Sequence, residues 1–170
     1  MGLRLPMALL GLAWLFCTQP VTAFDREQVL ERMRQSRPDD LQVLIERPAA
    51  IGTLSIGIYG VTPTPSDPNT RTYQLWEESA SDLNVYFETV NCSTAKPVRV
   101  KRTSLMVYVR TLNPGGPITD VNREDHLVWW AACVPEVAGT DPATLRQKAL
   151  DLGFSTLISE QQEQFPALAR

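Results

Sequence analysis

In the stretch Leu83-Asn84-Val85-Tyr86-Phe87-Glu88, every second residue is apolar, which puts Leu83, Val85 and Phe87 on one face of an extended chain. Residues 105–110, Leu-Met-Val-Tyr-Val-Arg, repeat this pattern, and residues 55–59 alternate around Ile56 and Ile58. A period of two is typical of strands with one buried face. The three stretches therefore predict half-buried strands that occupy the middle of the chain.

Further segments extend the predicted sheet. Residues 72–76 form a short strand, and Pro97 opens another that contains Val98 and Val100. Residues 127–134 are apolar on both faces and include two tryptophans, which predicts a central strand covered on both sides. Residues 41–46 are apolar without a clear period, so both strand and helix stay open for them.

Loops and helices complete the pattern. Prolines and small polar residues predict two long loops, 62–70 and 113–124. Asp25 caps a helix that ends at Arg37-Pro38, and Asp141 with Pro142 begins a second one that ends at Gly153. Residues 159–170 have few apolar positions, so we expect a frayed tail. The chain is predicted to be a single α+β domain, with a mainly antiparallel β-meander sheet flanked by N- and C-terminal helices.

Residues 1–23 have the pattern of a secretory signal peptide. Arg4 gives a positive start, residues 7–16 are apolar apart from one glycine, and Val21-Thr22-Ala23 resembles a small-residue cleavage site. The apolar run is shorter than the roughly 20 residues that span a membrane. We expect cleavage before Phe24 and an exported domain over residues 24–170, without a transmembrane segment, in the periplasm, an organelle lumen or the medium.

The composition excludes some function classes. With 44% hydrophobic and 21% charged residues, the chain is an ordinary globular one. It has 16 basic and 19 acidic residues; residues 1–23 contain one basic residue, Arg4, and no acidic one, which leaves 15 against 19 and a net charge of −4. An acidic domain is poorly suited to nucleic acid, so no nucleic-acid partner is expected.

Export would leave one pair of cysteines, Cys92 and Cys133, because Cys17 lies in the predicted signal peptide. In an oxidising compartment we expect them to form a disulfide. Their spacing is not Cys-x-x-Cys, which favours a structural role over redox exchange. The chain also has too few cysteines and histidines for a zinc ribbon.

His126 is the single histidine and follows Glu124 and Asp125, so a histidine–carboxylate pair for acid–base catalysis is one hypothesis. The alternative is an exposed or locally hydrogen-bonded histidine. No activated-serine motif accompanies it, and the nearby carboxylates have no recognised calcium or zinc spacing. We therefore predict no catalytic residue, no metal and no cofactor.

Two groups of residues are candidates for binding. Tryptophans stack on sugar rings or peptides, and on a strand the neighbours Trp129 and Trp130 would point to opposite faces; core packing is the alternative. The candidate ligand-binding residues are Trp76, Trp130, Arg123 and His126. A basic cluster could meet an acidic partner or could protect an edge strand from pairing. Its members are Lys96, Arg99, Lys101 and Arg102.

Three functions are consistent with these features. The first is an exported, non-catalytic accessory or protein-binding domain whose partner is another exported protein. The second is a module that binds a small sugar- or peptide-type ligand through an exposed tryptophan. The third, and the least favoured, is a hydrolase that uses Glu124 or Asp125 with His126.

Overall fold

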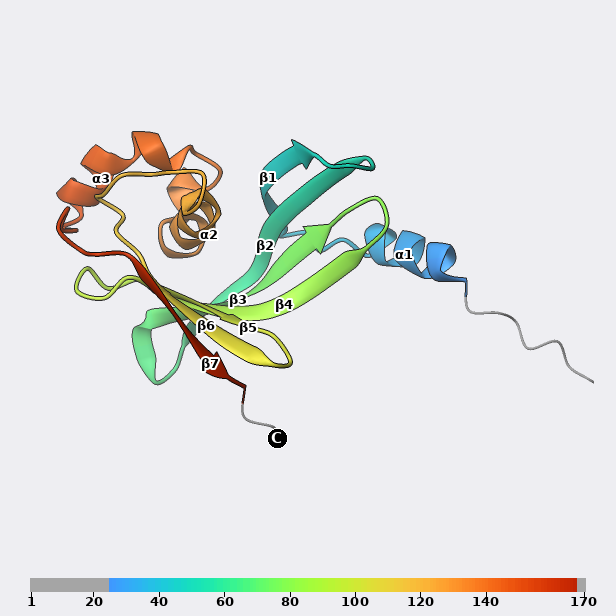
Figure 1. Ribbon diagram of the computed structural model, residues 1–170, viewed down its shortest axis with the longest axis horizontal. Coiled ribbons are helices and arrows are strands. Elements are labelled where there is room, and N and C mark those ends of the chain that lie inside the picture. The colour runs from blue at the N-terminus through green and yellow to red at the C-terminus, as the bar shows by residue number, and fades with distance from the viewer. Residues whose placement is uncertain (1–24, 168–170) are drawn as a thin grey trace, which may run out of the picture.

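A computed structural model describes residues 25–167, and seven strands in it form one antiparallel sheet (Figure 1). The strands lie side by side in chain order: β1 (Gln42–Pro48), β2 (Thr53–Thr64), β3 (Asp67–Glu78), β4 (Leu83–Asn91), β5 (Val98–Arg102), β6 (Met106–Thr111) and β7 (Gln161–Pro166). Helix α1 (Arg26–Gln35) precedes the sheet. Between β6 and β7 lie α2 (Arg123–Cys133), the 3₁₀ turns η1 (Pro135–Val137) and η2 (Pro142–Thr144), and α3 (Arg146–Asp151). The prediction of a single α+β domain built on an antiparallel meander is confirmed.

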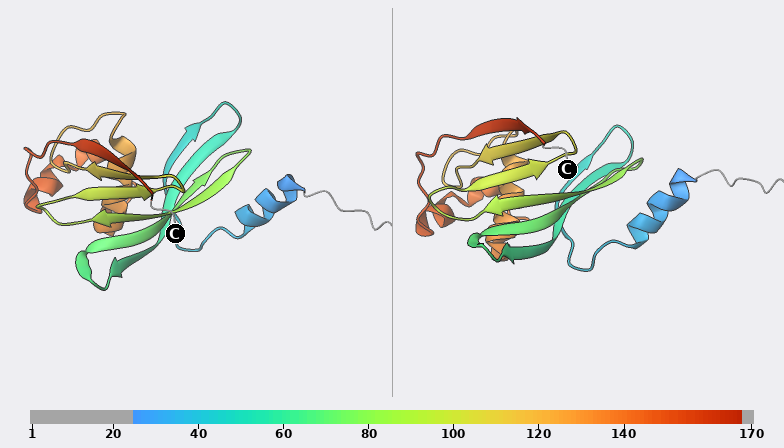
Figure 2. Two further views of the ribbon diagram at one scale, coloured as in Figure 1. Left: turned by 60° about the horizontal axis from the view of Figure 1, so that its bottom comes forward. Right: turned by 90° about the horizontal axis from the view of Figure 1, so that it is seen from below.

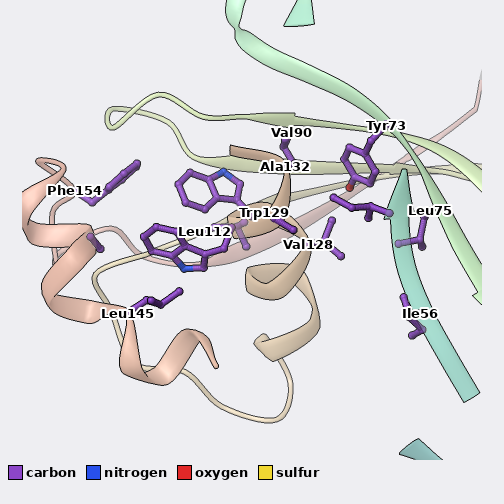
Figure 3. Close-up of a cluster of buried hydrophobic side chains, with 14 residues drawn as sticks. Ile56, Tyr73, Leu75, Val90, Leu112, Val128, Trp129, Ala132, Leu145 and Phe154 are labelled. Atoms are coloured by element: carbon purple, nitrogen blue, oxygen red, sulfur yellow. The ribbon is translucent and has the colours of Figure 1, made fainter. Parts of the chain in front are cut away.

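Helix α2 packs on one face of the sheet, which we call the inner face. Side chains from β2, β3 and β4, among them Ile56, Leu75 and Val90, pack in one cluster with Val128 and Trp129 of α2 (Figure 3). Leu145, Ala149 and Phe154, from the segment that follows α2, close the far side of the helix. This helix is therefore enclosed on all sides, and eight of its eleven residues are buried.

Helix α1 covers part of the opposite, outer face. Its Leu30 is buried against Trp76 and Leu83. As predicted, Asp25 caps its N-terminus, accepting hydrogen bonds from the backbone N–H groups of Glu27 and Gln28. The helix ends just before Arg37-Pro38.

The segment 127–134 was predicted to be a strand, and this prediction is wrong, because most of it belongs to α2. An apolar run without a polar face fits a buried helix as well as a buried strand. Acidic residues in the first turn, Glu124 and Asp125, favour the helix through its dipole. As a consequence, Trp129 and Trp130 are not on opposite faces of a sheet but side by side in the core.

The predicted loop 62–70 is also wrong, because β2 and β3 continue through it as a hairpin. Pro63 pairs with Arg71 next to two register shifts, where a missing N–H is tolerated. The side chain of Asp67 accepts hydrogen bonds from the backbone N–H of Asn69 and the hydroxyl of Thr70, which stabilises the start of β3.

Residues 41–46 and the predicted tail both contribute strands. Gln42–Pro48 is β1, the first edge of the sheet, and the extended alternative for this region is the one observed. Gln161–Pro166 pairs with β6 as β7, although its residues are exposed and we expected fraying. Main-chain pairing, rather than burial of an apolar face, therefore holds this strand. The predicted signal peptide, residues 1–23, lies outside the described residues.

The predicted disulfide between Cys92 and Cys133 is confirmed. It joins the end of β4 to the last residue of α2, with the two Cα atoms 5.5 Å apart. The bond therefore fixes α2 to the sheet at the C-terminal end of the helix. A set of ion pairs holds the N-terminal end of α2.

Candidate functional site

A pocket with a cavity volume of about 320 Å³ lies between the N-terminal turn of α2 and the inner face of β5, β6 and β7. The register of β5 and β6 explains why polar side chains meet here. Lys101 pairs with Tyr108, and Arg99 pairs with Arg110. All four side chains therefore project from the inner face. The loop before α2 adds Val121, whose side chain is 76% exposed. Glu124 and Asp125 of α2 and Gln162 of β7 complete the walls.

A second pocket, of about 460 Å³, lies between β1 and the same turn of α2. It is lined by residues 44–47 of β1 and by the loop and helix residues Asp120, Val121, Arg123, Glu124 and Leu127. Val121 and Glu124 line both pockets, so the two adjoin and pass around the N-terminus of α2. We call the two pockets together the inner-face groove.

Arg99 is the centre of the charged base of this groove. Its side chain is fully buried, and its Nε donates to Glu88 at 2.9 Å while its Nη1 donates to Asp125 at 2.8 Å and to Glu124 at 3.3 Å. Tyr73 donates its hydroxyl hydrogen to the same oxygen of Glu88, at 2.7 Å. Strands β3, β4 and β5 are thereby joined to α2 through a single guanidinium.

Two partly exposed cations extend the network toward the surface. Lys101 Nζ lies 2.9 Å from Glu124, and Arg110 Nε lies 3.2 Å from Asp125. The side chains of Lys101 and Glu124 are 36% and 32% exposed, so this pair is open to solvent and to a partner. Three basic and three acidic side chains therefore form this network, and their charges balance.

Protonation states follow from these contacts. Burial alone would raise the pKa of Glu124, but Lys101 and Arg99 outweigh it and lower that pKa. Burial likewise opposes the charge on Arg99, whereas Tyr73, Glu88 and Asp125 raise its pKa above the ordinary value. Burial raises the pKa of Tyr73 well above 10.0. Tyr73 therefore stays protonated and donates a hydrogen bond to Glu88. Near neutral pH, Glu124 is therefore ionised and Arg99 is positively charged.

Two buried donors of this network make no hydrogen bond within residues 25–167, Nη2 of Arg99 and Nε of Arg110, although the latter lies in the ion pair with Asp125. Buried donors without a partner cost free energy, because they lose their bonds to water. Arg99 also lines the groove, so a donor without an acceptor lies at the base of the candidate site.

His126 lies outside the groove and inside the fold. Its side chain is fully buried, and Nε2 lies 2.6 Å from Glu160, the residue just before β7. Glu160 also accepts hydrogen bonds from the backbone N–H of Asn113 and from the side-chain amide of Asn122. The structure therefore shows a locally hydrogen-bonded histidine that ties α2 to the start of β7, and not an exposed acid–base group.

We expect the Glu160 carboxylate to stabilise the fold in a pH-dependent way. Burial would raise its pKa, but the hydrogen bonds from His126, Asn122 and Asn113 outweigh burial and lower the pKa below 4.5. A lowered carboxyl pKa contributes stability that is present above the unfolded value and is lost as the pH falls through the folded value. Glu160→Gln should therefore reduce the free energy of unfolding by about 1–2 kcal/mol at neutral pH and flatten its dependence on pH in the acid range.

Urea denaturation at a series of pH values from neutral to acid measures this effect. Glu46→Gln is the matched control, because Glu46 is exposed on β1 and makes no ion pair within the described residues. We expect the free energy of unfolding of Glu46→Gln to depend on pH as that of the unmodified protein does. If the free energy of unfolding of Glu160→Gln showed this same dependence, the role of Glu160 would be refuted.

The candidate tryptophans are not available for stacking on a ligand. Trp76 is 4% exposed beneath α1, and Trp130 is 1% exposed in the core. Of the four candidate ligand-binding residues, Arg123 lines the groove next to β1, where it pairs with Asp141 of the loop that precedes η2. The structure therefore does not bring Trp76, Trp130, Arg123 and His126 together into one site.

The basic cluster also separates in space. Its strand, β5, lies between β4 and β6, so the interpretation of an edge strand protected by charge is wrong. Arg99 and Lys101 point to the inner face and reach the groove, whereas Arg102 points to the outer face beside Val107. Lys96 is exposed before β5 begins.

Several groove residues were not predicted from the sequence as site residues. Tyr108 and Arg110 are in phase along one strand, so the alternation places them on one face together. An acidic residue within an apolar strand, Glu88, was a further signal, because buried charges are paired. Their contact with α2 could not be predicted while residues 127–134 were assigned to a strand.

Comparisons with known proteins leave the site to be interpreted from its own chemistry. No protein-family model matches the chain, and no similar curated protein or solved structure was found. Among residues 25–167, no group of three or more histidine, cysteine or acidic side chains is arranged to hold a metal ion. In the same part of the chain, no helix has the length and apolar character needed to cross a membrane.

Proposed function

We propose that the protein is an exported, non-catalytic binding domain that holds a partner protein in the inner-face groove. Export is supported by the pattern of residues 1–23 and by the Cys92–Cys133 disulfide, which is typical of oxidising compartments. Binding is supported by a groove that combines exposed charges of both signs with tyrosine and an exposed valine.

The observation that carries the proposal is the mixture of groups at the mouth of the groove. Lys101 and Glu124 present opposite charges side by side, and Tyr108 lies directly across from Lys101 on the next strand. A surface of balanced charge with an amphipathic ring favours a polypeptide of mixed charge over a strongly charged partner. Val121 adds an exposed apolar side chain between the two pockets, where a partner's apolar residue could pack.

The two other hypotheses have less support. A ligand module that stacks on tryptophan requires an exposed indole, and Trp76, Trp129 and Trp130 are all buried. A hydrolase built on His126 requires a substrate to reach the imidazole, and this side chain is fully buried against Glu160.

Val121→Asp tests the groove directly. Partner binding would then place a carboxylate in the interface beside Glu124, so we expect binding to weaken by about 2 kcal/mol or more, which is roughly thirtyfold. The protein is purified with its partners from its native exported fraction by a C-terminal tag, and co-purified proteins are quantified by mass spectrometry. Stability should change little, because Val121 is largely exposed.

Leu157→Asp provides the matched control, since Leu157 is an 89% exposed apolar loop residue that lines neither pocket of the groove. A partner retained equally by the unmodified protein and by both variants would show that the groove is not the binding surface. Absence of any stoichiometric partner would overturn the proposal itself.

A further inference from the structure

No described helix covers the outer face of β5, β6 and β7 (Figure 2). Apolar side chains of β4 to β7 lie on this face. Helix α1 packs near Trp76 and Leu83, at one end of this face only. Beyond it, Phe87 of β4 is 72% exposed and Phe165 of β7 is 48% exposed. Two large aromatic side chains in water on one face indicate an interaction surface.

The strand register shows that these side chains belong to one patch. Across the sheet, Val100 pairs with Val109, and Val107 pairs with Phe165. Phe87 lies on the same face, two residues before Thr89, which pairs with Val100. We call these five residues the outer patch: Phe87, Val100, Val107, Val109 and Phe165.

The patch has one charge of each sign at opposite corners. Arg102 pairs with Val107 in one row of the face, and Glu163 pairs with Val109 in the next row. Arg102 lies on β5 and Glu163 on β7, so the two are separated by two strands and one row. Within residues 25–167 neither side chain makes an ion pair, whereas Arg99, Lys101 and Arg110 on the inner face all do.

We infer that the outer patch binds a second copy of this chain, as a symmetric dimer. Strands lie about 4.8 Å apart and same-face residues on a strand about 6.8 Å apart, so the two charges lie at opposite corners of a rectangle of about 9.6 by 6.8 Å. A two-fold axis that runs along the other diagonal, between two facing sheets, brings each of these corners to within about 4 Å of the other's position, which long side chains can span. Each copy's Arg102 then faces Glu163 of the other copy.

The same axis brings like residues together along the diagonal on which it lies. Phe165 of one copy meets Phe165 of the other, at one end of the patch, and Val100 meets Val100 at the other end. The strands of the two sheets then cross at about 70°, closer to the orthogonal than to the aligned of the two common ways in which sheets pack. Apolar contact and charge pairing are satisfied by one arrangement, and this self-complementarity favours a second copy over an unrelated protein.

Analytical ultracentrifugation of the purified protein over a dilution series tests this inference. We expect a monomer–dimer equilibrium. Phe165→Ser should weaken dimerisation at least about tenfold, because two exposed rings are lost from the interface at once. Glu163→Arg or Arg102→Glu should weaken it by about tenfold as well, since the symmetry repeats each like-charge contact twice.

The charge-swapped double variant, Arg102→Glu with Glu163→Arg, should recover most of the affinity, which a structural role of either residue would not explain. Lys96→Glu, two residues before the end of β5 that is far from Arg102, should leave the dimer unchanged. A protein that stays monomeric at every concentration would overturn the inference. So would a dimer that persists unchanged in Phe165→Ser and in both charge reversals.

Circular dichroism of each variant checks that the fold is intact. The result is also independent of the proposed function, because Val121→Asp changes the inner-face groove and should leave dimerisation unaffected.

Discussion

Replacing Arg99 with methionine should lower the free energy of unfolding by about 3–5 kcal/mol. The substitution keeps most of the apolar stem but leaves Glu88 and Asp125 without the cation that both of them contact. Removing one partner of a buried ion pair is costly because the remaining charge loses water without compensation. Glu88 is 3% exposed, so water cannot easily replace the guanidinium.

Urea denaturation followed by tryptophan fluorescence measures this change. Lys101→Met is the matched control, because its pair with Glu124 is solvent-exposed and should contribute only about 0–1 kcal/mol. The double variant Glu88→Gln with Arg99→Met should cost less than the sum of the two single variants, since they share one interaction. If Arg99→Met cost no more than Lys101→Met, Arg99 would not be the centre of the network.

Replacing both Cys92 and Cys133 with serine should lower the free energy of unfolding by about 4 kcal/mol, on the chain-entropy model for a loop of this size. The bond joins residues 41 apart in sequence and holds the end of α2 against β4. Without it, the unfolded chain gains conformational freedom, and the native contacts alone must hold α2. All these measurements use one protein concentration, because dimerisation would also contribute to apparent stability.

Reducing agent supplies the internal control for this second prediction. It should destabilise the unmodified protein about as much as the double serine substitution does, and it should leave the double variant unchanged. Equal stability of the two proteins under oxidising conditions would contradict a structural role for the disulfide.

The strands could be predicted where one face is buried. Alternation at residues 55–59, 83–88 and 105–110 identifies β2, β4 and β6, because a period of two survives wherever one side of a sheet meets the core. Alternation alone did not show which face is covered. Phe87 was grouped with Leu83 and Val85, but only these two lie near α1, and Phe87 is exposed.

The two largest differences have separate physical causes. Helix α2 is enclosed on all sides, so it lacks the polar stripe that would reveal a helical period. Strand β7 is held by its pairing with β6 and by the hydrogen bonds of Glu160, so its sequence of polar residues carries no alternation. In both cases the structure depends on contacts between segments distant in sequence.

The candidate site was predicted only in part, for the same reason. The basic cluster drew attention to Lys101 and Arg99, which do lie at the groove, and Glu124 was considered as a possible acid. Their meeting depends on α2 crossing the inner face, and this was not predicted. Aromatic residues were the weaker guide, because large rings near the middle of a small domain are needed for its core.

The sheet thus offers two surfaces with different chemistry. The inner-face groove combines paired charges with tyrosine, and the outer patch combines exposed aromatic and valine side chains with two unpaired charges at its corners. A dimer formed through the outer patch would leave both grooves open. Two copies of the partner could then bind to one dimer.

Site-specific photo-crosslinking tests the central claim, that the groove holds a partner protein, most directly. The photoreactive residue p-benzoylphenylalanine replaces Tyr108 in the groove, Phe87 in the outer patch, or the exposed Leu157 as a control. After irradiation in the native compartment, we predict a heterologous protein crosslinked at position 108, a second copy of the chain at position 87, and neither at position 157. A heterologous crosslink at 87 or 157 with none at 108 would contradict the account.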